Sequence, residues 1–237
     1  MSTMDPAEIA KFAQISHEWW DLDGKFKMLH RINPVRMEYI RNHLMNEKNA
    51  KFEELKFLDI GCGGGILSES LAQLGAQVIA IDRSEKIIGA ALSHQKESLS
   101  KVDYRVQSSK DLTLTHSGGF DAVFAMEVLE HVADVATFLR ECATLLKPGG
   151  LFFFATLNRT PKSWLMAIMG AEYILGWLPK GTHQYEKFIR PSELAMEMRK
   201  AGLEMDHLAG MSYLPLADSW QIGVDVSVNY LGVGVRV

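Results

Sequence analysis

The sequence predicts an α/β fold built on a mostly parallel, doubly wound sheet, with N-terminal helices and a helical insertion after the fifth strand. Short apolar runs recur five times between residues 57 and 155, and helical stretches separate them. Strands that alternate with helices indicate parallel pairing. A glycine-rich turn, residues 61–65, directly follows the first run. With 237 residues, 47% of them hydrophobic, the chain can bury the core of one such domain.

Residues 1–50 are expected to form a helical cap that precedes the main domain, which takes up residues 51–237. Helices are predicted at residues 6–20 and 34–45, because a proline opens each of them. Asp21, Asp23 and Gly24 favour a turn between the two helices.

In the main domain, strands and helices are expected to alternate as far as Thr156. The predicted strands are residues 57–60, 78–81, 102–106, 122–125 and 151–155. The predicted helices are residues 65–74, 84–93 and 134–146, the last ended by the Lys-Pro-Gly-Gly run at 147–150. The insertion follows at 158–185, then a helix that opens at 190–193 and two apolar runs near 208–214 and 224–237.

Composition and charge argue against several classes of protein. The net charge is -4 and no run of clustered Lys and Arg residues occurs, so the sequence does not predict the basic surface that binds nucleic acid. Cys62 and Cys142 stand far apart, which favours neither a disulfide framework nor a structural zinc site. The first 20 residues lack the pattern of a signal or transit peptide, and no apolar run reaches the roughly 18 residues that span a bilayer. We therefore expect a cytoplasmic protein.

Gly61, Gly63, Gly65 and Asp82 carry the case for a cofactor site. In a doubly wound sheet the ligand lies beyond the carboxyl ends of the strands, where glycine lets it approach the backbone. Asp82 ends the second predicted strand, where a carboxylate can accept hydrogen bonds from ribose hydroxyls. A tight turn with no ligand is the alternative. A dinucleotide loop would need a third glycine at Ile66, so the pattern disfavours NAD.

The stretches at residues 126–132 and 145–150 complete a combination that resembles the class I SAM-dependent methyltransferases, which have a Rossmann-like fold. The resemblance implies that Gly61 and Gly63 line the methionine part of S-adenosyl-L-methionine (SAM) and that Asp82 binds the ribose. It also implies that Met126 packs near the adenosine. A core residue at the end of a strand is the other interpretation of Met126.

Three segments outside this common core are similar to the ubiquinone-biosynthesis O-methyltransferases, and the similarity covers nearly the whole chain. These segments are residues 19–36, 158–164 and 170–183. The resemblance implies methylation of ring hydroxyls on polyprenylated phenol and quinol intermediates, at two steps, with a ubiquinone-biosynthesis complex as partner. It also implies that Arg36 binds the SAM carboxylate, which suits a bidentate cation. The final residues, 231–237, depart from the more polar ending expected of the family.

Glu127, Glu130 and His131 are the candidate catalytic or metal-binding residues. They stand at i, i+3 and i+4, so they would share one face if the segment were helical. A phenol titrates near pH 10, so a base or a metal helps at neutral pH. His131 with Glu130 would accept the phenolic proton, or all three side chains would hold Mg²⁺, as the family resemblance implies. A polar helix start is the remaining interpretation.

Residues 163–178 are too apolar for an ordinary loop and too short to span a bilayer. A helix buried against the core and a segment that lies in a membrane interface are both consistent with this composition. The polyprenyl substrate that the resemblance implies favours peripheral contact with the inner membrane, with Lys162 and Lys180 at anionic headgroups. The rival functions are a methyltransferase for another small-molecule acceptor, an NAD(P)-dependent oxidoreductase and a non-catalytic partner in a biosynthetic complex.

Overall fold

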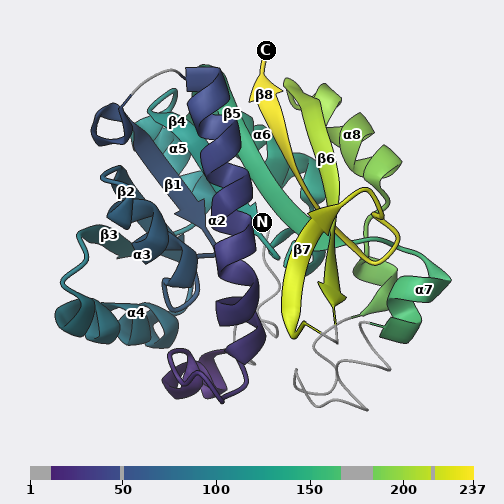
Figure 1. Ribbon diagram of the computed structural model, residues 1–237. Helices are drawn as coiled ribbons and strands as arrows, with labels where there is room; N and C mark the ends of the chain where they lie inside the picture. Colours follow the sequence, from purple (N-terminus) through teal and green to yellow (C-terminus); the bar gives the residue numbers. More distant parts are fainter. Residues whose placement is uncertain (1–11, 49–50, 167–183, 215–216) are drawn as a thin grey trace.

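A mixed sheet of eight strands runs through the protein and carries helices on both faces (Figure 1). The structure is a computed structural model and describes residues 12–48, 51–166, 184–214 and 217–237. The strands are β1 Lys56–Ile60, β2 Gln77–Asp82, β3 Val102–Val106, β4 Phe120–Met126, β5 Leu146–Leu157, β6 Leu203–Leu214, β7 Ser219–Gly223 and β8 Asn229–Arg236. The helices and single turns are η1 Ser16–Glu18, α2 Lys27–Lys48, η2 Phe52–Glu54, α3 Ile66–Gln73, α4 Glu85–Ser98, α5 Ser109–His116, η3 Leu129–His131, α6 Val135–Leu145, α7 Pro161–Ser163, η5 Tyr185–Lys187 and α8 Pro191–Lys200.

The strands follow the order β3-β2-β1-β4-β5-β8-β6-β7. The five strands β1 to β5 pair in parallel, while β8 pairs antiparallel with both β5 and β6. The parallel strands reverse their order between β1 and β4. That switch point is where a doubly wound fold binds its ligand. The mostly parallel sheet predicted from the sequence is confirmed.

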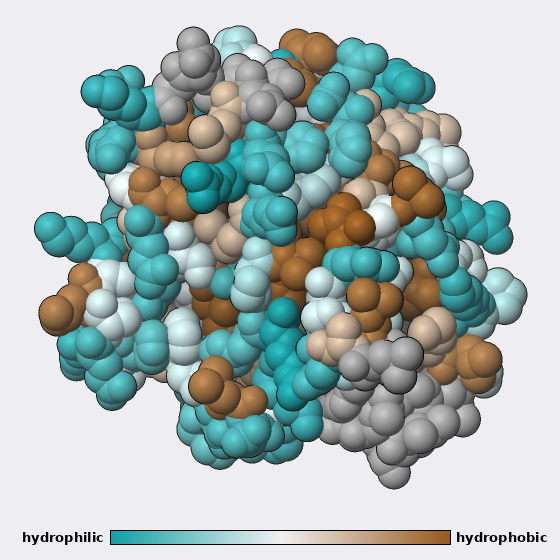
Figure 2. Space-filling model, in the orientation of Figure 1, coloured by the Kyte–Doolittle hydropathy of each residue, from teal (hydrophilic) through white to brown (hydrophobic). Residues whose placement is uncertain are grey.

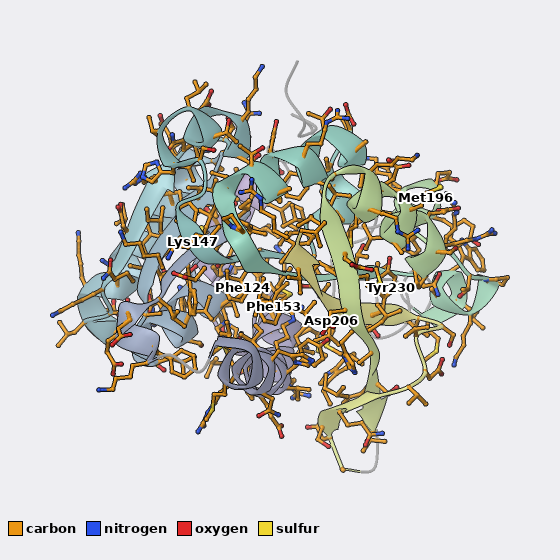
Figure 3. All side chains as sticks on the ribbon, turned by 90° about the horizontal axis from the view of Figure 1, so that it is seen from above. Phe124, Lys147, Phe153, Met196, Asp206 and Tyr230 are labelled. Carbon is orange, nitrogen blue, oxygen red and sulfur yellow. The ribbon has the colours of Figure 1, made fainter. Side chains whose placement is uncertain are left out.

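Two hydrophobic layers hold the helices against the sheet. One layer joins α2, α3 and α4 to one face, and the other joins α5, α6 and α8 to the opposite face. Strand side chains alternate between the layers, as the period of two requires: Phe153 belongs to the first, and its neighbours Phe152 and Phe154 belong to the second. Figure 3 shows Phe124 and Phe153 beside one another under α2, and their rings stack at 5.1 Å between centroids.

The helix α2 begins at Lys27 and carries Pro34 inside it, so the predicted start at residue 34 is wrong. Apolar side chains before and within its first turns are buried, among them Phe26, Met28 and Ile32. Their burial favours helix ahead of the proline and outweighs the hydrogen bond that proline removes. Of the helix predicted at 6–20, residues 1–11 lie outside the described part; residues 12–14 are helical, and η1 follows them.

Besides single turns, one helix and one strand were not predicted, and strand β5 begins earlier than predicted. Helix α5 and strand β7 lie in stretches whose sequence showed no clear period, and β7 pairs with β6 along the edge of the sheet. The helix predicted at 134–146 is confirmed as α6, which ends at Leu145 just before the Lys-Pro-Gly-Gly run at 147–150. That run belongs to β5, so the strand begins at Leu146 and the predicted start at 151 is wrong. The pairing of β4 with β5 shifts register there, and Gly149 has a φ of 68°. The glycines thus form an irregularity at the start of a strand.

Candidate active site

The glycine loop, residues 61–65, joins β1 to α3 at the carboxyl end of the parallel strands. Gly61, Gly63 and Gly65 have φ angles of 67°, 55° and 93°, which glycine adopts without steric cost. The backbone amides of Gly61 and Cys62 donate hydrogen bonds of 2.8 and 3.1 Å to the carbonyl of Ile81. The loop is therefore fixed to the end of β2, as a cofactor turn at the switch point requires.

Protein side chains fill the space that the absent Cβ atoms leave. A Cβ at Gly61 would lie 2.7 Å from Val128, and one at Gly65 would lie 2.0 Å from the Tyr104 hydroxyl. A Cβ at Gly63 would lie 2.1 Å from the indole ring of Trp19. The packing of the protein thus requires these glycines independently of any ligand. The role of Gly61 and Gly63 beside SAM stays a prediction.

Asp82 lies where the sequence placed it, at the end of β2 and against the glycine loop. Its Oδ2 accepts a hydrogen bond from the Gly63 amide at 3.4 Å, and its Oδ1 accepts one from the Ser84 amide at 2.9 Å. Burial raises the pKa of Asp82 above its ordinary value, and these amide donors oppose the rise. The carboxylate thus reaches the loop and the start of α4 together, a position suited to ribose hydroxyls.

Asp59 is a second acidic residue of this site, and it was not predicted from the sequence. It lies in β1 and is 2% exposed, and its Oδ2 accepts a hydrogen bond of 2.5 Å from the Ser68 hydroxyl. Burial raises the pKa of Asp59 to about 7; the charge of Asp82 adds to the rise, whereas Ser68 and the charge of Arg36 oppose it. The sequence did contain a signal for Asp59, namely an acidic residue inside an apolar strand directly before a glycine-rich turn.

Arg36 lies on α2 and is 4% exposed, and its guanidinium forms an ion pair with the carboxylate of Glu127. Glu127 follows β4 with a φ of 52°, a left-handed conformation that is uncommon outside glycine. Its amide donates a hydrogen bond of 2.9 Å to the carbonyl of Ala155. The sequence predicted both residues as functional, but it did not predict that they touch.

The segment with Glu127, Glu130 and His131 is not one helix, so the predicted shared face is wrong. Only residues 129–131 form a 3₁₀ turn, η3, and Glu127 lies before it in the left-handed region. Glu130 is 3% exposed and accepts a hydrogen bond of 2.8 Å from the Thr156 hydroxyl. His131 is half-buried, and its ring meets the edge of Phe12 at 5.5 Å between centroids.

This arrangement does not fit the predicted Mg²⁺ site. Glu127 pairs with Arg36, while Glu130 is buried against Thr156. No group of three His, Cys, Asp or Glu side chains within residues 12–48, 51–166, 184–214 and 217–237 is placed to hold a metal. A divalent cation would need the acidic oxygens to converge.

Met126 ends β4 and packs, half-buried, against the hydrophobic layer under α2. The position suits either of the roles that the sequence left open for this residue. The free thiols of Cys62 and Cys142 are both buried, and burial raises the pKa of each well above its ordinary value. Neither thiol is thus available as a reactive thiolate.

The insertion is described only at its two ends, and residues 167–183 lie outside the described part. Trp164, Leu165 and Met166 follow α7 and are 43%, 58% and 53% exposed. Hydrophobic surface lies near α7 on the face drawn in Figure 2. Lys162 forms an ion pair of 2.7 Å with Asp225, which weakens its predicted role at anionic headgroups. No helix in the described ranges is long and apolar enough to cross a membrane.

Comparison with known proteins gives a match over most of the chain. A family model described as a methyltransferase domain matches residues 28–208. The ubiquinone biosynthesis O-methyltransferase of Aromatoleum aromaticum is 52% identical over 96% of this chain and 94% of its own. The enzyme of the same name from Nitrosococcus oceani is 49% identical over 98% of this chain and 96% of its own.

Solved structures support the same fold. The magnesium protoporphyrin IX methyltransferase of Synechocystis, with bound SAH, superposes with a TM-score of 0.65 at 19% identity, over 98% of this chain and 95% of its own. A SAM-dependent methyltransferase of Aquifex aeolicus gives 0.62 at 16% identity, over 98% and 99%. The predicted class I methyltransferase fold is therefore confirmed. Because relatives that match it over nearly their full length are about 50% identical to it, the chain belongs to the family of ubiquinone biosynthesis O-methyltransferases.

Proposed function

We propose that this chain transfers the methyl group of SAM to ring hydroxyls of polyprenylated phenol and quinol intermediates, at two O-methylation steps of ubiquinone biosynthesis. The observation that carries this proposal is the contact between Asp82 and Gly63, which joins the predicted ribose carboxylate to the cofactor loop. The relatives of the same family, about 50% identical, supply the substrate class.

Four residues are assigned to the cofactor, and they divide three tasks among them. Gly61 and Gly63 give the loop its left-handed turns, and Asp82 accepts hydrogen bonds from the ribose hydroxyls. Arg36 binds the carboxylate of the cofactor through a charge-assisted pair. When bound, SAM supplies an electrophilic methyl group, so the remaining task of the chain is to orient and deprotonate the acceptor.

His131 is our candidate for the general base. An imidazole titrates near neutral pH and can take the proton of a phenolic hydroxyl as its oxygen becomes methylated. Its half-buried ring follows β4, at the same edge of the sheet as the glycine loop. Glu130 acts beside it as a positioning residue, because its hydrogen bond with Thr156 fastens η3 to β5.

Mg²⁺ held by Glu127, Glu130 and His131 stays a prediction from the family resemblance, and we assign no step to it. Binding it would require Glu127 to leave Arg36 and the buried Glu130 to turn away from Thr156. Dialysis against EDTA decides the matter. Loss of catechol methylation that Mg²⁺ restores would support the metal, and full activity after dialysis would reject it.

Peripheral contact with membrane lipid through residues 163–178 forms the second part of the proposal. The exposed side chains of Trp164, Leu165 and Met166 support it, since apolar and aromatic residues favour a membrane interface. Flotation with anionic vesicles tests it: wild-type protein should float, and a variant that lacks residues 163–178 should stay at the bottom. Equal behaviour of the two would contradict the lipid contact. Membership in a ubiquinone-biosynthesis complex is proposed from the family alone.

A turnover assay separates this function from that of a methyltransferase for another small molecule. The protein is incubated with SAM and a short-chain demethylated ubiquinol, and the methylated product is measured. Product formation supports the proposal. Binding of SAM with no methylation of any quinol or catechol would favour a different acceptor.

A further inference from the structure

The N-terminal segment, residues 12–26, covers the glycine loop. Trp19 is 7% exposed, and its ring stacks on that of Phe26 at 3.8 Å between centroids. A Cβ at Gly63 would lie 2.1 Å from the Trp19 ring, and one at Gly64 would lie 2.2 Å from it. The indole therefore lies directly against the loop backbone, on a face that only glycine leaves open. Phe26, Ile66 and Ile87 are the other buried members of this cluster.

Trp20 fastens the same segment to the loop and to α4. Its Nε1 donates a hydrogen bond of 2.8 Å to the carbonyl of Gly64. Its ring lies almost parallel to the imidazole of His94, with 3.3 Å between centroids and 5° between planes. His94 Nδ1 in turn lies 3.0 Å from Oε1 of Glu69, a carboxylate on α3 that is 3% exposed. The stack of Trp20 on His94 thus links the segment to α4, and the contact between His94 and Glu69 extends that link to α3.

The segment also reaches the candidate base. The ring of Phe12 contacts that of His131, and Trp19 contacts the glycine loop, so one stretch of chain lies over both halves of the site. In Figure 1 the segment and the start of α2 lie at the end of the sheet toward which the parallel strands run. Apart from three helical residues, 12–14, and the single turn η1, these residues form no regular element. They are therefore held mainly by side-chain contacts.

We propose that residues 12–26 form a cover that must open for SAM to enter, and that His94 with Glu69 is the anchor that holds Trp20 and keeps the cover closed. This inference rests on the proposed use of the glycine loop for SAM. The reason is steric: with Trp19 packed against Gly63 and Gly64, a ligand cannot reach that face of the loop from solvent. His94 and Glu69 act through Trp20, so they are positioning residues.

The rate of SAH association to His94→Ala tests the cover. This variant keeps all five tryptophans as fluorescent reporters and removes the ring under Trp20 together with the partner of Glu69. A weaker anchor leaves the cover open more often, so the association rate constant in stopped flow should rise about ten-fold, the effect of one aromatic stack. Lys96→Ala, at an exposed position of α4, is the matched control and should bind at the wild-type rate. His94→Phe restores a ring and should return the rate toward wild type.

An association rate that stays within two-fold of wild type, or falls, while SAH still binds, would overturn the cover. Failure of wild-type protein to bind SAH would instead contradict the proposed function, so the two failures are distinct. A fluorescence measurement covers the case in which His94→Ala does not fold. The fluorescence change on SAH binding should be reduced in Trp19→Phe, because Trp20 remains as a reporter in the cover, and kept in full in Trp164→Phe, a residue that is 43% exposed. A change that Trp19→Phe keeps in full would also overturn the proposal.

Discussion

Replacement of Arg36 by methionine tests the cofactor half of the site most sharply. The guanidinium is 4% exposed and pairs with Glu127, whose side chain is 28% exposed. Removing one partner of a fully buried pair costs about 3–5 kcal/mol, and an exposed pair is worth about 0–1 kcal/mol. Because Glu127 keeps contact with water, we expect Arg36→Met to lower the free energy of unfolding by about 2 kcal/mol.

The effect of the same variant on cofactor binding is separate from its effect on stability. A charge-assisted hydrogen bond contributes about 1.5–3 kcal/mol, so the Kd for SAH in calorimetry should rise about 10–100-fold. Arg36→Lys keeps the charge without the bidentate geometry, and its Kd should fall between those of wild type and Arg36→Met. Arg41→Met, at an exposed position of the same helix, is the control. A Kd for Arg36→Met within two-fold of wild type would refute the role of Arg36 at the carboxylate.

Three further predictions concern the loop, a buried acid and a buried hydrogen bond. Gly63→Ala should lower the free energy of unfolding by about 2 kcal/mol and weaken SAH binding, because φ at Gly63 is 55° and the new Cβ would strike the indole of Trp19. Gly149→Ala is the control: φ there is 68°, but the new Cβ would meet no neighbouring atom. It should lose only about half as much stability and bind SAH normally. Because burial raises the pKa of Asp59 from 3.8 to about 7, the folded state holds a proton that the unfolded chain releases above pH 4. The free energy of unfolding should therefore fall from pH 4 to 7, and Asp59→Asn should remove up to about 4 kcal/mol of that fall in urea titrations; an unchanged pH profile would contradict the assignment. Thr156→Val deprives the buried Glu130 of its donor and should cost about 1–3 kcal/mol in urea unfolding, whereas a cost near zero would show that Glu130 does not depend on this bond.

The parallel part of the fold could be predicted because its signals are local. The strands β1, β2 and β4 and the second half of β5 are short apolar runs, and in β3 apolar residues alternate with charged ones. The glycine loop directly follows β1. The position of Asp82 followed from the same rule, since the carboxyl ends of adjacent parallel strands meet at one edge. The start of α8 could also be predicted, because Pro191 opens the helix and Glu193 accepts a hydrogen bond from the Arg190 amide.

Features that depend on tertiary contacts could not be predicted in this way. The spacing of Glu127, Glu130 and His131 fits a helix, but contacts with Ala155 and Arg36 hold Glu127 in a left-handed conformation. No periodicity in a sequence reveals that conformation.

Burial in the folded protein also determined features that the sequence alone does not show. It moved the start of α2 ahead of Pro34 and raised the pKa of Asp59. The contact of Trp19 with the glycine loop joins two segments that lie far apart in the sequence. Such a contact becomes visible only once both segments have been placed in the fold.

The most direct test of the function is SAM-dependent turnover of a short-chain demethylated ubiquinol, with and without Mg²⁺. The account predicts a product methylated on a ring oxygen, together with a large loss of kcat/KM in Asp82→Ala and in His131→Ala. The proposed substrate would be contradicted if folded protein that binds SAH formed no methylated quinol both with and without Mg²⁺. Unchanged turnover by Asp82→Ala would contradict the assignment of the cofactor site.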